Sequence, residues 1–237
     1  QGKDDYIGAA GIVSLHLRAT GAQVTFSTVL GDDPLKDFVI DGLKDSGIKL
    51  DAIIDPTRPT INKNVVIAEG YRLLKIDTLD NRPVSESILE KLIQSITNSS
   101  ADGVAFCDFR HGIFSRMSVP LLTKAIPPNT FCVADSQVAS RWGNITEFKG
   151  FDLITPNERE SRFALADQDS TIGGLSGLLH ERAENKNLIL KLGERGVFCS
   201  VKDQTVNDSY FSVSSFASTV NDAVGSGDAL LAYATLT

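Results

Sequence analysis

The residues best suited to chemistry form one run near the end of the chain, Asn221-Asp222-Ala223-Val224-Gly225-Ser226-Gly227-Asp228. The run follows a β-like stretch at 209–216 and opens an apolar segment, so its position is typical of a strand-to-helix turn. Gly225, Ser226 and Gly227 have small side chains or none, and a ligand can therefore approach the backbone closely. Because amide groups at a helix N-terminus attract negative charge, the run predicts an anion site.

The carboxylate that ends this run, Asp228, does not fit a purely binding role, because it would repel a phosphate. It does fit a base, since a carboxylate can take the proton from a hydroxyl that attacks a phosphoryl group. The alternative is an ordinary glycine-rich turn in which Asp228 caps the helix, and the pattern alone favours neither interpretation.

Composition excludes several classes of partner. The chain has 237 residues, of which 42% are hydrophobic, which is enough to bury a full α/β core. A net charge of −7 argues against nucleic acid and anionic membranes, and no apolar stretch approaches the length of a membrane span. The three cysteines are far apart, which favours reduced thiols and a cytoplasmic protein.

Predicted helices and strands alternate along the chain. Helices are expected at 10–20, 34–46 and 84–96, and strands at 24–30, 103–107, 130–134, 151–154 and 187–192. Short apolar strands separated by helices predict an α/β fold with a mostly parallel sheet covered on both faces. Two β-runs at 62–68 and 71–77, joined by Glu69-Gly70, predict a hairpin that forms a separate small sheet.

Polar clusters directly follow the predicted strands, where ligands bind in parallel sheets. These clusters are Asp108-Phe109-Arg110-His111-Gly112, Asp135-Ser136-Gln137, Thr155-Pro156-Asn157-Glu158-Arg159-Glu160 and Gly193-Glu194-Arg195-Gly196. Each alone is more typical of a solvated loop, but together with the 221–228 run they predict a cleft.

Asn157 and Glu160 stand one helical turn apart at the start of a predicted helix. The spacing puts both side chains on one face of the helix, where they could serve a metal ion at the cleft. The same spacing also suits a capping box, in which the two side chains satisfy the first amides of the helix.

Other familiar sites are absent from the sequence. It has no Gly-x4-Gly-Lys-Ser/Thr motif, and Gly225-Ser226-Gly227 lacks the third glycine of a dinucleotide fingerprint. His16, His111 and His180 are isolated from one another and from any cysteine pair, which argues against zinc.

The 222–228 run resembles the C-terminal signature of the PfkB (ribokinase-like) carbohydrate kinases. Further motifs agree in order and spacing, namely Gly8-Ala9-Ala10 with Gly21-Ala22, Thr155-Pro156-Asn157-x-x-Glu160, and Lys191-Leu192-Gly193-Glu194-Arg195-Gly196. The most similar branch is the kinase domain of ADP-heptose synthesis proteins, which Thr57-Arg58-Pro59-Thr60-x-x-Lys63 and Leu73-Leu74-Lys75-Ile76-Asp77 resemble. The resemblance implies a ribokinase-like three-layer α/β/α domain with a small β lid at about 57–78.

The resemblance also implies a function, the phosphorylation of a sugar or sugar phosphate by ATP with Mg²⁺ and a monovalent cation such as K⁺. It makes Asp228 the catalytic base and the amides of Gly225, Ser226 and Gly227 the anion hole. For the metal ions, it places Asn157 and Glu160 near Mg²⁺ through water, and Asp222 and Val224 at a monovalent cation. The residues that it places at the nucleotide are Asn157, Lys191, Gly193 and Gly196. Those that it places at the sugar are Gly8, Gly11, Asp108 and His111.

The chain departs from the family pattern at several of these positions. Gly11 stands where an Asn is usual, and His111 and Gln137 stand where the heptose branch has Lys. A fixed positive charge is missing from both places, which argues against heptose 7-phosphate as the substrate. Lys191 replaces a small polar residue, and Ala223 replaces Thr or Val.

We expect residues 1–237 to form a single domain that is shorter than the family at both ends. Val65, Ile67, Leu73 and Ile76 are expected to give the lid a partly apolar face, which predicts a homodimer formed lid to lid. The alternative to a kinase is a non-catalytic module of the same fold that serves regulation or oligomerisation next to a nucleotidyltransferase domain. An α/β oxidoreductase or another nucleotide-binding enzyme is a third hypothesis, and the missing glycine fingerprints argue against it.

Overall fold

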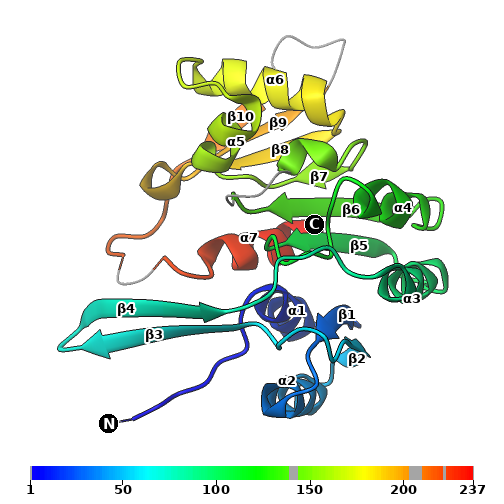
Figure 1. Cartoon of the computed structure of the whole chain (residues 1–237). Helices are drawn as coiled ribbons and strands as arrows, with labels where there is room; N and C mark the ends of the chain where they lie inside the picture. Colours follow the sequence, from blue (N-terminus) through cyan, green and yellow to red (C-terminus); the bar gives the residue numbers. More distant parts are fainter. Residues whose placement is uncertain (1, 139–143, 203–209, 221–222, 237) are drawn as a thin grey trace.

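A six-stranded sheet forms the centre of the computed structural model, which describes residues 2–138, 144–202, 210–220 and 223–236 (Figure 1). The order of the strands is β10-β9-β8-β7-β6-β5. Their bounds are β5 (Gly103–Asp108), β6 (Phe131–Ser136), β7 (Leu153–Ile154), β8 (Asn187–Lys191), β9 (Val197–Val201) and β10 (Tyr210–Val213). Strands β5 to β8 pair in parallel, and β9 and β10 continue the sheet antiparallel. The predicted mostly parallel sheet is confirmed.

Helices cover both faces of this sheet (Figure 1). Helices α3 (Glu86–Thr97), α4 (Ser118–Lys124), α5 (Glu158–Leu165) and α6 (Ile172–Ala183) lie on one face, and α1 (Ala10–Ala19) and α7 (Ser226–Thr235) on the other. Alternation along β6 shows why both faces must be covered, because successive side chains point to opposite sides. Val133 belongs to the same buried cluster as Leu231 of α7, whereas its neighbour Ala134 belongs to the cluster that contains Leu175 of α6.

The N-terminal part adds a short parallel pair, β1 (Thr25–Leu30) and β2 (Lys49–Ile54), connected by α2 (Pro34–Asp45). Val29 and Ile53 anchor this pair in the core beside α3. The sequence did not predict β2, because only the end of this strand is continuously apolar. It also did not predict β9, which is short and follows β8 after a single turn.

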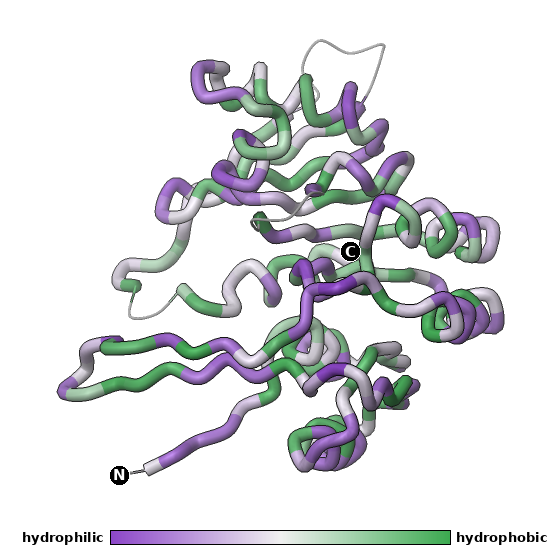
Figure 2. Tube along the Cα trace, in the orientation of Figure 1, coloured by the Kyte–Doolittle hydropathy of each residue, from purple (hydrophilic) through white to green (hydrophobic). Residues whose placement is uncertain are grey.

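The predicted hairpin forms a separate two-stranded sheet, β3 (Asn62–Ala68) and β4 (Tyr71–Thr78), and projects from the body of the molecule (Figure 1). Glu69 and Gly70 both have positive φ, 51° and 81°, as a tight two-residue hairpin turn requires. Hydrophobic residues occur along both strands although every residue of β4 is exposed (Figure 2).

One detail of the hairpin prediction is wrong. Ile76 lies opposite Asn64, and Val65 lies opposite Lys75, so Ile76 and Val65 are on different faces. A bulge between Val66 and Ile67 shifts the register beyond them. The apolar residues therefore divide between two faces, and Val66, Leu74 and Ile76 share one of them.

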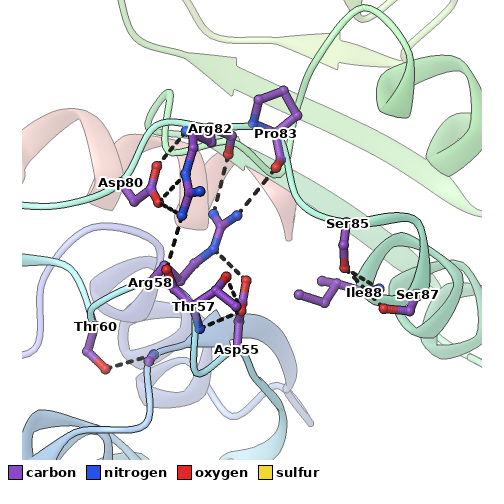
Figure 3. Close-up of polar contacts among 11 residues, drawn as sticks. Asp55, Thr57, Arg58, Thr60, Asp80, Arg82, Pro83, Ser85, Ser87 and Ile88 are labelled. Carbon is purple, nitrogen blue, oxygen red and sulfur yellow. Dashed lines mark hydrogen bonds and ion pairs between the residues drawn. The ribbon is translucent and has the colours of Figure 1, made fainter.

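Two arginines fasten the base of the hairpin (Figure 3). Arg58 Nε lies 2.7 Å from Asp55 Oδ2, and its terminal nitrogens donate to the carbonyls of Arg82 and Pro83 at 3.4 Å. In return, Arg82 donates to the Thr57 carbonyl at 3.0 Å and to Asp80 Oδ2 at 2.7 Å. The segments before and after the hairpin are thus bonded directly to each other.

No helix in the part of the chain that the structure describes is both long and apolar enough to cross a membrane.

Candidate active site

A cleft of about 570 Å³ opens where the carboxyl ends of β6 and β8 meet the N-terminus of α7. It brings together most residues that the sequence singles out for the nucleotide, the metal and the chemistry. Those that line it are Asn157, Glu160, Lys191, Gly193, Gly196, Gly225, Ser226, Gly227 and Asp228.

The glycine-rich run turns into α7 as predicted. Gly225 adopts a positive φ of 84°, and the first bond of the helix ladder runs from the Ala229 amide to the Gly225 carbonyl at 2.9 Å. The amides of Gly227 and Asp228 therefore precede the ladder and are the donors of the helix N-terminus. The Ser226 amide instead donates to the Ala223 carbonyl at 3.2 Å, which leaves fewer amides for an anion than the sequence predicts.

Asp228 occupies the first turn of α7 and is partly buried. Burial raises the pKa of its carboxyl group, and the negative charge of Asp135 raises it further. Lys191, His16 and Lys63 oppose this shift in pKa. A carboxylate with a raised pKa accepts a proton more readily than an exposed one, so the environment suits a general base.

The capping box that the spacing of Asn157 and Glu160 allows is present at the start of α5. Asn157 Oδ1 accepts from the Glu160 amide at 2.8 Å, and Glu160 Oε2 accepts from the Asn157 amide at 2.7 Å. The cap uses one oxygen of Glu160, and the other, Oε1, takes no part in it. Burial, reinforced by Asp135, raises the pKa of Glu160 to about 7.

The donors around the cleft are compatible with Mg²⁺ held mainly by phosphate and water. Among the described residues, no group of three or more His, Cys, Asp or Glu side chains is arranged to hold a metal directly. Carboxylate and amide oxygens from Glu160 and Asn157 are the ligand type that Mg²⁺ prefers, and it commonly keeps several waters. Of the predicted monovalent-cation residues, Asp222 lies outside the described residues, and Val224 is exposed.

Gly193 and Gly196, which the resemblance assigns to the nucleotide, have different physical roles. Gly193 has a positive φ of 63° and no atom within 4 Å of an added Cβ, so a side chain at this position would strain the backbone without clashing with a neighbour. At Gly196, an added Cβ would lie 2.0 Å from the Val213 carbonyl oxygen. Only glycine lets β10 pass this close to the turn, and the segment that follows β10 lines the cleft.

The residues assigned to the sugar do not line this cleft. Gly11 is buried, and an added Cβ would lie 2.5 Å from Ile7 Cγ2. Gly8 precedes it and accepts from the Gly11 amide at 3.0 Å. Asp108 is buried and accepts hydrogen bonds from the Arg110 guanidinium, from the Arg110 amide at 2.8 Å and from Ser136 Oγ at 2.9 Å.

His111 lies at the base of the hairpin. Its Nδ1 is 3.0 Å from Asn81 Oδ1, and burial, reinforced by Lys63, lowers its pKa to about 4. Lys63 itself lies over the ring of Phe109 and influences the pKa of Asp228. Lys63, a residue to which the sequence gave no role at the site, therefore lies within electrostatic range of both His111 and Asp228.

Asp135 belongs to one of the strand-end clusters that the sequence predicts at the cleft, but the sequence gave it no role of its own. Asp135 lines the cleft and forms an ion pair with Lys191, and its negative charge raises the pKa of both Glu160 and Asp228. Its place near the end of a parallel strand was the available signal, but many strand-end carboxylates are simply solvated.

Known proteins resemble this chain over almost its whole length. The model of the pfkB family carbohydrate kinases matches residues 6–235. The chain is 27% identical over 233 residues to the bifunctional protein HldE of Pelobacter propionicus, covering 95% of this chain and 46% of that protein. It is 29% identical over 234 residues to HldE of Campylobacter fetus, covering 95% and 48%. The chain therefore spans about half the length of these curated relatives.

Solved structures show the same fold. Phosphofructokinase-2 from Escherichia coli, in its tetrameric inhibited form, superposes with a TM-score of 0.76 at 14% identity and covers 97% of this chain and 74% of that one. Ribokinase from Giardia lamblia gives 0.73 at 16% identity, with 94% and 68% covered. These likenesses confirm the predicted ribokinase-like fold. Since the family match extends over nearly the whole sequence, the chain belongs to the pfkB family of carbohydrate kinases.

Proposed function

We propose that this chain catalyses transfer of the γ-phosphoryl group of ATP to a hydroxyl group of a sugar or sugar phosphate. The observation that carries the proposal is the position of Asp228. Its carboxyl group, with a raised pKa, stands at the N-terminus of α7 in the same cleft as Asn157, Glu160 and Gly193. The residue proposed as the base, the helix end proposed to bind the phosphate and the predicted nucleotide residues therefore line one cleft.

The proposed reaction is an in-line displacement. The acceptor hydroxyl gives its proton to Asp228 while its oxygen forms a bond to the γ-phosphorus, and the bond from that phosphorus to the bridging oxygen breaks to release ADP. The amides at the start of α7 donate to the phosphoryl oxygens as charge develops there. Mg²⁺, held through water near Asn157 and Glu160, would neutralise charge on the phosphates.

The acceptor would lie between Asp228 and the base of the hairpin, near Gly8, Gly11, Asp108 and His111. Because the pKa of His111 is about 4, its imidazole is neutral at physiological pH and supplies no charge for a phosphate. This favours an acceptor other than heptose 7-phosphate, in agreement with the missing lysines at positions 111 and 137.

A second function has one specific observation in its favour. Asp108, the carboxylate assigned to the sugar, is occupied by Arg110 and Ser136. A domain that had lost its substrate would tolerate this arrangement, which supports the alternative of a non-catalytic module next to a nucleotidyltransferase domain.

A kinase assay of the full-length protein distinguishes the two functions. ADP release would be measured with a panel of hexoses, heptoses and their phosphates, with Mg²⁺ and with K⁺ exchanged for Na⁺. We expect ADP release that depends on one acceptor and disappears in Asp228→Asn. Binding of ATP without ADP release for every acceptor would favour the non-catalytic module.

A further inference from the structure

Lys191 is, among the residues that the structure describes, the single lysine or arginine that lines the cleft. It is the last residue of β8, and its amide donates to the Pro156 carbonyl at 2.9 Å. This bond joins the end of the strand to the segment that leads into Asn157. The backbone of Lys191 is thus fixed at the point where the cleft begins.

The side chain of Lys191 is held as firmly as its backbone. Its Nζ lies 3.1 Å from Asp135 Oδ1 and 3.0 Å from Oδ2, so both carboxylate oxygens share the ammonium group. The two side chains are only 15% and 13% exposed. A long flexible side chain is therefore restricted to one direction, which reduces the entropy that a ligand contact would cost.

That direction brings the ammonium group to the anion-binding run. A Cβ added to Gly227 would lie 3.3 Å from Lys191 Nζ and 3.7 Å from its Cδ. Gly227 lies inside α7 and has no positive φ, so glycine serves here to admit the lysine rather than to allow an unusual backbone conformation.

Charge in the cleft indicates what the lysine does. Asp135, Glu160 and Asp228 all line the cleft, and three carboxylates would repel a polyphosphate. Lys191 lowers the pKa of both Glu160 and Asp228, whereas Asp135 raises both, which shows that the ammonium group lies within electrostatic range of each.

We infer that Lys191 binds the transferring phosphoryl group directly, by donating a hydrogen bond from its ammonium group to a non-bridging γ-oxygen. Asp135 is the positioning residue that holds the ammonium group against Gly227. The inference rests on the proposed function and adds a fixed cation to its displacement step, in which the γ-phosphorus gains the acceptor oxygen and loses the bridging oxygen of ADP. A lysine serves this role as a point charge beside the phosphoryl group.

A purely structural ion pair between β6 and β8 is the competing explanation, and nucleotide binding separates the two. Isothermal titration would use the full-length protein with Mg²⁺ and either ADP or the non-hydrolysable ATP analogue AMP-PNP. In Lys191→Met, which keeps the length of the stem, we expect AMP-PNP affinity to fall about 10- to 100-fold, the range of a charge-assisted hydrogen bond, with ADP affinity unchanged.

Two further variants test the positioning role. Lys191→Arg keeps a charge and should recover part of the AMP-PNP affinity. Asp135→Asn keeps the lysine charged but holds it less firmly, and should lose less affinity than Lys191→Met. Unchanged ADP binding shows in each case that the variant is folded.

Equal losses for ADP and AMP-PNP in Lys191→Met, or no loss for either, would overturn the inference and leave the proposed kinase function standing. Failure of the unmodified protein to bind either nucleotide would overturn both. Because no sugar is needed, the result is independent of the identity of the acceptor.

Discussion

Three carboxylates and one lysine determine the electrostatics of the cleft. Asp135 is paired with Lys191, whereas Glu160 and Asp228 have raised pKa values because they are buried near Asp135. Buried carboxyl groups with shifted pKa values that line a cleft are typical of catalytic sites, although structural ion-pair networks also shift pKa values. Variants of single residues are therefore needed to separate catalysis from capping.

The Asp228→Asn variant best distinguishes a catalytic role of Asp228 from a purely structural one. Asparagine retains the size of the side chain and caps a helix about as well as aspartate, but it cannot accept a proton. If Asp228 is the base, kcat should fall about 10²- to 10⁴-fold while ATP affinity stays near its normal value. Steady-state kinetics and nucleotide titration on the full-length protein measure the two quantities.

Gly225 is the N-cap of α7 and no side chain caps this helix, so the predicted cap by Asp228 is absent and Asp228 can favour α7 only through its charge in the first turn. If that is its whole role, the same variant should keep its full rate and lose little in melting temperature. Full activity in Asp228→Asn would therefore contradict the mechanism proposed here.

Burial of Glu160 predicts a particular dependence of stability on pH. Its pKa is about 7 in the folded protein and near 4.5 in the unfolded chain, so the unfolded chain releases this proton first as pH rises. The contribution of the group to stability is complete below about pH 4.5 and is lost as pH rises through about 7. We expect the melting temperatures of the wild type and Glu160→Gln to be similar at pH 5, and that of the variant to be higher at pH 8.

Gln is a suitable replacement because it also completes a capping box, so the helix start is retained. The variant should at the same time need more Mg²⁺ for turnover, if Glu160 organises the metal through water. Normal Mg²⁺ dependence would restrict Glu160 to the cap, whereas a constant difference in melting temperature at all pH values would contradict its raised pKa.

At the scale of elements, the base of the hairpin predicts unequal roles for two arginines. The side chains of Arg58 and Asp55 are 8% and 6% exposed, whereas that of Arg82 is 63% exposed. Removing one partner of a buried ion pair leaves the other charge without compensation, and exposed pairs contribute little. Arg58→Met should therefore lower the melting temperature clearly more than the matched variant Arg82→Met, as measured by thermal unfolding.

Most elements could be predicted because their signals are local. Glu69-Gly70 between two β-runs specifies the hairpin turn, and Pro34 after Asp33 marks the start of α2, where Asp33 accepts from the Leu35 amide at 3.1 Å. Strand β2 was missed because its stability comes from pairing with β1 and from Ile53 in the core, which no local pattern records.

Site residues could likewise be predicted where their signal is local in sequence, and could not where their contacts form only on folding. The run ending at Asp228 is recognisable because its glycines and carboxylate are adjacent in sequence. Asp135 and Lys191 are 56 positions apart and become partners only when β6 and β8 lie on either side of β7. Lys63 is 165 positions before Asp228 in the sequence and comes within electrostatic range of it only in the folded chain.

At the scale of the whole molecule, the two faces of the hairpin sheet differ in their side chains. Lys63, Lys75 and Asp77 are on the same face as Val65, and the charge of Lys63 lowers the pKa of Asp228. On the other face, Val66, Leu74 and Ile76 are 46%, 53% and 50% exposed. A two-stranded sheet is marginally stable by itself in water, so we expect another protein surface to cover this apolar face.

We therefore predict that two copies dimerise through the face made by Val66, Leu74 and Ile76. A two-fold dimer places the same patch of both copies in contact, so one substitution acts twice. Leu74→Glu should convert the dimer to a monomer, because it brings two carboxylates into an apolar interface. Val65→Glu, on the opposite face of the same hairpin, is the matched control and should remain a dimer. Light scattering at micromolar concentration measures both, and a monomeric wild type at that concentration would show that this face is not a dimer interface.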